Sequence, residues 1–251
     1  MRYFILLIIC AIIGACQTTP IESAIDIKEN VSVYPFSLKH QVREAIRDGN
    51  KPVPALIMLH GLNSNENDLM PLARAIDKRI FVISLQAPLS DEPDSHKWFN
   101  MRFEGHKIMC NDAQAERSRL IILQFLEEAI AEYNLDPENI VFMGFSQGGM
   151  MAYQFSISTP HLIKGSAILS SYILESNKLK IGKQEDLDDL HLFISHGVDD
   201  KVIPYHRAVE SMKFLENVNI PHQFKLYPVG HKISEQNLID VVNWLEKVMF
   251  E

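Results

Sequence analysis

Gly144-Phe145-Ser146-Gln147-Gly148-Gly149 is the strongest indication of fold class in this 251-residue chain. It is a G-x-S-x-G sequence that follows an apolar run at residues 140–143, predicted to be a short central strand, and precedes a segment predicted to be helical. A tight turn from strand to helix exposes a serine hydroxyl, and the glycines relieve the crowding around it. We therefore predict that Ser146 is a nucleophile. The alternative is a glycine-rich packing turn whose serine has no chemical role.

Strand and helix patterns alternate on both sides of this turn. Apolar runs typical of strands buried on both faces occur at residues 53–59 and 80–85, and further strands are predicted at 165–169, 190–195 and 223–227. Helices are predicted at about 112–133, 205–217 and 233–249, and another is expected to begin at 67–73. Such alternation predicts a mostly parallel central sheet with helices on both faces.

The loops after the strands are expected to form the site, because ligands bind at the carboxyl ends of strands in sheets of this kind. We expect four loops to converge on one edge, namely those that begin at His60, Gly144, His196 and Pro228.

Four other segments carry predictions of their own. Residues 31–36 are predicted to be a peripheral strand, because Pro35 cannot donate to a ladder. Residues 89–109 are predicted to form a long irregular loop, and residues 136–139 a turn. The helix at 112–133 is expected to bury an apolar stripe formed by Leu120, Leu123, Leu126, Ile130 and Tyr133.

A serine hydroxyl needs a base within hydrogen-bond reach to act as a nucleophile. The order expected after such a turn is serine, acid, histidine. His231 follows the last predicted strand, and an acidic pair, Asp199 and Asp200, follows the strand before it. His231 is therefore the predicted base. Local chemistry does not separate the two aspartates, and His196 is expected to shape the turn that carries them.

Together, four ordered motifs resemble the phospholipase/carboxylesterase family of α/β-hydrolases, which includes acyl-protein thioesterases. They are residues 59–68, Gly144 to Gly149, the segment from His196-Gly197 to Pro204, and Gly230-His231. The resemblance implies an α/β-hydrolase fold without a large cap domain. It also implies that the triad aspartate is Asp200, the fifth residue of the His-Gly-x-x-Asp stretch.

An oxyanion hole needs two backbone N–H groups, one of them from the residue after the nucleophile. That residue is Gln147, and the resemblance assigns the second N–H group to Leu62. Within 89–109, Trp98 and Phe99, together with Met101 and Phe103, are expected to supply an apolar wall for the acyl pocket. The alternative is that these aromatic side chains cap the core beside the long helix.

The expected reaction is acyl transfer to water through an acyl-Ser146 intermediate, with short to medium acyl esters as substrates. Lysophospholipids and acyl thioesters are the alternative substrates, and a peptidase is a weaker possibility because the chain lacks substrate-positioning domains. A non-catalytic binding protein on a hydrolase scaffold is the rival from another class. Such proteins usually lose a triad member, whereas this sequence retains all three.

Composition restricts the partners. A net charge of −8 argues against nucleic acid, whose phosphates require a basic surface. No His-Glu-x-x-His or Cys-x-x-Cys spacing occurs, so no metal is implied and no cofactor is expected. Relatives in the family often pair through surface near the active site, which makes a homodimer an expectation.

The N-terminal sequence indicates that the protein is exported. Arg2 is followed by an apolar run at residues 3–13, shorter than the roughly 17–25 residues of a transmembrane helix. Ile13-Gly14-Ala15-Cys16 resembles the lipobox of bacterial lipoproteins, in which the cysteine is acylated. Gln17 would then favour the outer membrane, with the protein facing the periplasm. The alternative is an ordinary signal peptide cut near Ala15.

These patterns divide the chain into a signal peptide with a lipobox-like end at residues 1–16, a tether at 17–30 and a catalytic domain at 31–251. The catalytic domain would contain one cysteine, Cys110, and therefore no internal disulfide.

Overall fold

The computed structural model describes residues 36–104 and 107–251 of the chain. The predicted signal peptide, Cys16, the tether, and the strand at 31–36 except for Phe36 lie outside the described residues. The described residues contain the elements that position the site.

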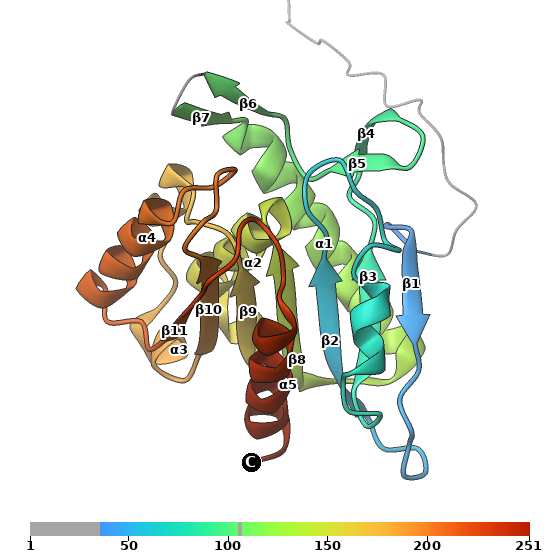
Figure 1. Ribbon diagram of the computed structural model, residues 1–251. Helices are drawn as coiled ribbons and strands as arrows, with labels where there is room; N and C mark the ends of the chain where they lie inside the picture. Colours follow the sequence, from blue (N-terminus) through green and yellow to red (C-terminus); the bar gives the residue numbers. More distant parts are fainter. Residues whose placement is uncertain (1–35, 105–106) are drawn as a thin grey trace, which may run out of the picture. The chain divides into compact units, whose positions relative to one another are not determined.

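A seven-stranded sheet is the centre of the described fold, with strand order β1-β3-β2-β8-β9-β10-β11 (Figure 1). Its strands are β1 (His40–Arg43), β2 (Val53–Leu59), β3 (Phe81–Leu85), β8 (Leu135–Phe145), β9 (Gly165–Leu169), β10 (His191–Gly197) and β11 (Gln223–Tyr227). All neighbouring strands are parallel except β1, which pairs antiparallel with β3 at one edge. The mostly parallel sheet is confirmed, whereas β1 was not predicted.

Five α-helices and three 3₁₀ helices accompany the sheet in the described part of the chain. They are α1 (Asp112–Tyr133), α2 (Gln147–Ser158), α3 (Gln184–Asp188), α4 (His206–Asn217), α5 (Glu235–Phe250), η1 (Met70–Arg74), η2 (Pro160–Leu162) and η3 (Glu175–Leu179). The bounds of α1 match the prediction because local signals set both ends. The Asn111 side chain accepts the N–H of Gln114 at 3.1 Å, and Asn134 ends the helix with φ of 47°.

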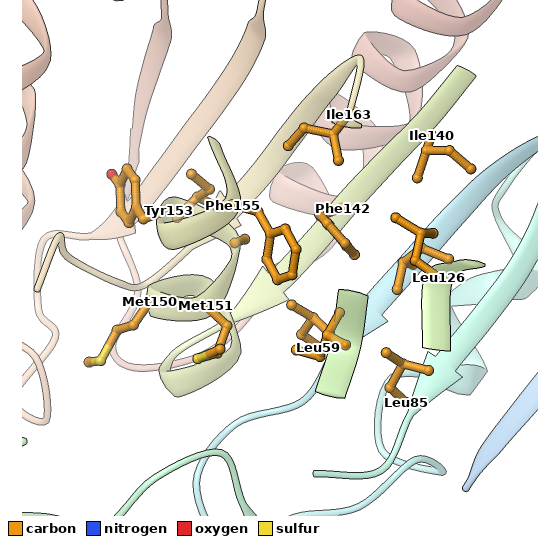
Figure 2. Close-up of a cluster of buried hydrophobic side chains, with 14 of the residues drawn as sticks. Leu59, Leu85, Leu126, Ile140, Phe142, Met150, Met151, Tyr153, Phe155 and Ile163 are labelled. Atoms are coloured by element: carbon orange, nitrogen blue, oxygen red, sulfur yellow. The ribbon is translucent and has the colours of Figure 1, made fainter. Parts of the chain in front are cut away.

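Helices cover both faces of the sheet, as predicted. Side chains alternate along β2: Ala55, Ile57 and Leu59 pack into one buried cluster, and Leu56 and Met58 into another. The first cluster, part of which is shown in Figure 2, contains the buried faces of α1 and α2. The second lies under η1 and α5, on the opposite face in Figure 1.

The buried stripe of α1 differs from the predicted one. Leu126 is buried and Leu123, Ile130 and Tyr133 pack against the core, but Leu120 is 52% exposed. Most of the burial comes from residues that were not predicted, namely Ala115, Ile122, Phe125 and Ala129. Apolar residues occur on more than one side of this helix, so spacing alone allows more than one stripe. Packing against the sheet selects among them.

Residues 89–109 are not irregular, in contrast to the prediction. They form two short hairpins, β4 (Leu89–Glu92) with β5 (Ser95–Lys97), and β6 (Met101–Glu104) with β7 (Lys107–Cys110). Both lie beyond the carboxyl ends of the parallel strands in Figure 1. Among the described residues, no larger insertion covers this edge of the sheet.

The turn predicted at 136–139 lies within β8. Leu135 pairs with Val53 and Ile140 with Ala55, so the four intervening residues bulge out opposite Pro54. The predicted helix at 67–73 is the 3₁₀ helix η1. No helix in residues 36–104 and 107–251 has the length and apolar character needed to cross a membrane.

Candidate active site

The four loops predicted to converge meet at a cavity of about 230 Å³ at the carboxyl edge of the sheet. Its lining includes Leu62 after β2, Ser146 after β8, Ile203 after β10 and His231 after β11. Parallel strands place the loops that follow them at one edge, which is the physical reason for this convergence.

Ser146 occupies a strained turn between β8 and α2. Its backbone has φ of 54° and ψ of −116°, a conformation that few non-glycine residues adopt. The Ser146 N–H donates to Leu169 O at 2.9 Å, and the Ser171 hydroxyl donates to Ser146 O at 2.8 Å. These bonds to the next strand and its loop hold the serine in the turn.

Close backbone approach explains the glycines around Ser146. A Cβ on Gly148 would lie 2.0 Å from Leu59 O, and a Cβ on Gly144 would lie 2.3 Å from Gly148 O. Any side chain at either position would push α2 away from β2 and β8. The sequence therefore needs glycine here to bring Ser146 up to the loop after β2.

Ser146, His231 and Asp200 form a continuous chain of hydrogen bonds. His231 Nε2 lies 2.9 Å from Ser146 Oγ, and His231 Nδ1 lies 2.7 Å from Asp200 Oδ2. An ionised carboxylate only accepts hydrogen bonds, so Nδ1 carries the proton and Nε2 is left to accept the serine proton. This arrangement can activate the Ser146 hydroxyl as a nucleophile.

Asp200, and not its neighbour, contacts the histidine. Asp200 is buried, and its Oδ1 accepts the N–H groups of Val202 and Ile203, each at 2.9 Å. Burial alone would raise the pKa of Asp200, but hydrogen bonds from His196, His231 and the Ile203 N–H hold that pKa well below its usual range. The carboxylate therefore stays ionised. Asp199 is exposed.

His196 shapes the acidic turn, in the position expected for it. Its Nε2 lies 2.7 Å from Ile203 O and 3.4 Å from Asp200 Oδ2. The imidazole is buried, and the Asp200 oxygen that it approaches is the one that His231 contacts, so both histidines hold this carboxylate in place.

The two amides predicted for the oxyanion hole have available N–H groups. Leu62 lies in the loop after β2 and lines the cavity, and Gln147 is the first residue of α2. Within residues 36–104 and 107–251, neither N–H group donates a hydrogen bond. The N-terminus of α2 adds a positive dipole end beside Ser146.

Trp98 and Phe99 do not line the cavity, in contrast to the predicted acyl pocket. Both side chains are fully buried, and the Trp98 carbonyl accepts a hydrogen bond from Ser118 of α1. The alternative, that they cap the core beside the long helix, describes their position. Sequence spacing could not separate the two because a fixed loop length allows either orientation.

The buried side chain of Gln147 is a structural contact that sequence reasoning missed. Its Oε1 accepts the Trp98 N–H at 2.8 Å, and its Nε2 donates to Phe99 O at 2.8 Å. Trp98 Nε1 in turn donates to His60 O at 2.9 Å. Trp98 thereby joins the loop after β2 to the start of α2.

Apolar side chains from separate segments form the cavity wall. Met101 and Phe103 line the cavity, as expected, and both come from β6. Phe145, Val202 and Ile203 complete the wall. The Phe145 and His231 rings also pack with centroids 4.9 Å apart. In the described part of the chain, no three His, Cys, Asp or Glu side chains are grouped as metal ligands would be.

Comparison with known proteins agrees with this geometry. The sequence profile of the family described as Phospholipase/Carboxylesterase matches residues 40–249. A carboxylesterase structure from Bacillus cereus superimposes with a TM-score of 0.72 at 25% identity, covering 84% of this chain and 94% of that one.

Two curated relatives differ in how much of their length is matched. The probable carboxylesterase SOBER1-like of Arabidopsis thaliana is 32% identical over 116 residues, which cover 46% of this chain and 44% of the relative. Acyl-protein thioesterase 1 of Kluyveromyces lactis is 26% identical over 230 residues, covering 82% of this chain and 97% of the relative. The chain thus spans less than half the length of the plant relative.

Proposed function

The chain belongs to the phospholipase/carboxylesterase family, and from this premise we propose that it is a serine hydrolase of carboxylic esters with Ser146 as its nucleophile. The observation that carries the proposal is the unbroken hydrogen-bonded chain from Ser146 through His231 to the ionised Asp200. It stands beside a cavity and two available N–H groups, which an inert scaffold would not need.

The reaction follows from the positions of these groups. His231 Nε2 takes the Ser146 proton as Oγ attacks the ester carbonyl carbon, and the carbonyl oxygen becomes an oxyanion. The N–H groups of Leu62 and Gln147 stabilise that charge. His231 then protonates the leaving alcohol, which gives acyl-Ser146. Water repeats the sequence and releases the acid, while Asp200 remains ionised and orients the imidazole.

Short to medium acyl esters are the proposed substrates. The cavity of about 230 Å³ lies below the range of about 300–1,000 Å³ that is typical of sites for drug-sized ligands. Its walls are apolar near Ser146, so an acyl chain of limited length gains burial there. A longer chain would extend past the half-exposed Phe103 into solvent.

Acyl thioesters and lysophospholipids are the second candidates. The observation that favours thioesters is the match to acyl-protein thioesterase 1, which covers nearly the whole length of that relative. The same acyl-serine intermediate serves esters and thioesters, so the triad does not distinguish them. Rates for substrates that share an acyl chain but differ in having an alcohol or a thiol leaving group would distinguish the two.

The test is hydrolysis of p-nitrophenyl esters from acetyl to palmitoyl, with matched acyl thioesters, by wild type and Ser146→Ala. We expect a burst of p-nitrophenol from wild type, an optimum at short to medium chains, and loss of hydrolysis in the variant. An unchanged rate in Ser146→Ala would contradict the nucleophile assignment. A wild type that cleaves no ester or thioester would favour a binding protein on a hydrolase scaffold.

We also propose that the protein is exported to the bacterial cell envelope and anchored to the outer membrane through acylated Cys16. The sequence of residues 13–16 and the apolar run before it support this proposal. Mass spectrometry of the membrane-extracted protein should detect an acylated Cys16 as the new N-terminus. Wild type that fractionates like Cys16→Ala, with no acyl mass, would favour an ordinary signal peptide.

We also propose that the protein forms a homodimer. The proposal is based on the pairing that is common among relatives in the family. Sedimentation of the purified protein should give about twice the mass of one chain. A monomer at micromolar concentration would contradict it.

A further inference from the structure

His60 is a fully buried histidine beside the oxyanion loop that the proposed mechanism does not use. Its Nε2 accepts the Ala87 N–H at 3.0 Å, and its Nδ1 lies 2.7 Å from Gly61 O. A backbone N–H can only donate, so Nε2 must be unprotonated. The proton of the neutral ring is therefore on Nδ1, which donates to the Gly61 carbonyl.

The Gly61 carbonyl that accepts this hydrogen bond belongs to the same peptide group as the Leu62 N–H. Peptide groups are planar, and in a trans peptide the C=O and N–H point in opposite directions. The described chain has no cis peptide bonds. Holding Gly61 O toward the buried imidazole therefore turns the Leu62 N–H away from it, toward the cavity that Gly61 and Leu62 line.

We infer that His60 is a positioning residue for the oxyanion hole, which orients and polarises the Leu62 N–H through the Gly61 carbonyl. This inference rests on the proposed function, because it assigns a means of organising the same site. A hydrogen bond accepted by the carbonyl also polarises the attached N–H, since linked hydrogen bonds strengthen one another.

Three features hold the imidazole in this role. The Trp98 indole N–H donates to His60 O at 2.9 Å, and the ring of Trp98 packs on the imidazole with centroids 5.4 Å apart. Burial lowers the pKa of His60 to about 4, so the ring stays neutral at neutral pH. A charged ring would lose the Ala87 bond, because Nε2 would then carry a proton.

The two hydrogen bonds of His60 can be removed separately, which gives a matched pair of variants. In His60→Asn the amide nitrogen takes the place of Nδ1 and keeps a donor for Gly61 O. In His60→Gln the amide oxygen takes the place of Nε2 and keeps an acceptor for the Ala87 N–H. Both variants lose one hydrogen bond and the imidazole ring, so their losses of stability should be similar.

The experiment compares kcat and KM for p-nitrophenyl butyrate in wild type, His60→Asn and His60→Gln, with burst amplitude reporting the fraction of active enzyme. We expect kcat of His60→Gln to fall about 10-fold to 100-fold below that of His60→Asn, with similar KM values. Loss of an oxyanion donor costs about 10²–10³ in kcat, and a misdirected donor should cost less. An effect confined to the transition state leaves KM unchanged.

Equal kcat values in the two variants, or a lower kcat in His60→Asn, would overturn the inference. A second measurement does not depend on catalysis: ¹⁵N–¹H correlation spectra of histidine-labelled wild type, with the His60 signals assigned by their loss in His60→Asn. We expect the His60 proton on Nδ1 from pH 5 to 8. A proton on Nε2 would refute the inference even in an active enzyme. An inactive wild type would refute the proposed function, while the spectra would still decide the tautomer.

Discussion

Asp199 and Asp200 have the same chemistry, yet only one of them can serve His231. The turn after β10 directs Asp200 inward, where two backbone N–H groups and two imidazoles surround its carboxylate. The Asp199 backbone N–H donates to Val229 O at 3.1 Å, and Asp199 is exposed to solvent. Position in the turn, rather than residue type, separates the two carboxylates.

We expect Asp200→Asn to lower kcat by about 10³–10⁴-fold, because the amide can donate to His231 and stabilise the wrong tautomer. Asn keeps an oxygen for the Val202 and Ile203 N–H groups, so the fold should persist. Asp199→Asn is the matched control and should stay near the wild-type rate. Steady-state kinetics with p-nitrophenyl butyrate check both, and equal losses in the two variants would contradict the assignment.

The buried imidazole of His60 should also make the free energy of unfolding depend on pH. The pKa of His60 falls from 6.5 to about 4 on folding, chiefly through burial, with a smaller lowering effect from His96. The hydrogen bond to Gly61 and the charges of Asp68 and Glu66 oppose this effect. Between these pH values the unfolded state binds the proton and the folded state does not.

The free energy of unfolding should therefore fall as pH falls from 6.5 to 4, by about 3 kcal/mol from this group. Urea unfolding at pH 4 to 8 measures this dependence in wild type and in His60→Asn. The variant should have a flatter profile across this window, since its side chain does not titrate. Parallel profiles for the two proteins would show that His60 is not buried in its neutral form.

Among the elements, the β6–β7 hairpin contributes apolar side chains to the cavity wall. It brings Met101 and Phe103 to the wall, while the parallel strands supply the reacting groups. Phe103 is 49% exposed, so it contributes a rim to the cavity rather than a sealed wall. We therefore expect the hairpin to influence which acyl-chain lengths are preferred, whereas the residues after the strands carry out the reaction.

We expect Phe103→Ala to lower kcat/KM for octanoyl esters about 5-fold and to leave acetyl esters nearly unchanged. Losing about 1 kcal/mol of apolar contact with the longer chain accounts for that factor. Met109→Ala is the matched control: Met109 lies on β7, is similarly exposed and does not line the cavity. A uniform loss for all esters would contradict a role in chain-length preference.

At the scale of the whole molecule, the sheet divides the core into two clusters that must be stable together. The chain has two tryptophans, and they lie in different clusters: Trp98 in the cluster of α1 and α2, and Trp244 in the cluster of α5. β2 contributes alternate residues to both clusters. Unfolding of one face would therefore expose apolar residues of the other.

We expect a single cooperative transition that both tryptophans report. In Trp98→Phe the fluorescence comes from Trp244, and in Trp244→Phe it comes from Trp98. For each variant, the urea curve from fluorescence should coincide with its own curve from far-ultraviolet circular dichroism. Separate midpoints by the two probes in either variant would show that the two faces unfold independently.

Residue patterns alone predict the strand–helix alternation, the parallel sheet and the order of Ser146, the acidic pair and His231. Periodicity and turn chemistry act within a few residues, and strand–helix alternation predicts parallel strands whose carboxyl ends meet at one edge. The resemblance to a family supplied Asp200 and Leu62, which local chemistry does not single out.

Which side chains face the cavity depends on tertiary packing and could not be predicted from residue patterns. Trp98 and Phe99 were expected there with Met101 and Phe103, but the first two are buried against Gln147 and α1, and the last two reach the wall. The same holds for the stripe of α1 and for the hydrogen bonds of His60. Each depends on which distant segment packs against the residue, and that partner is not encoded in neighbouring positions of the chain.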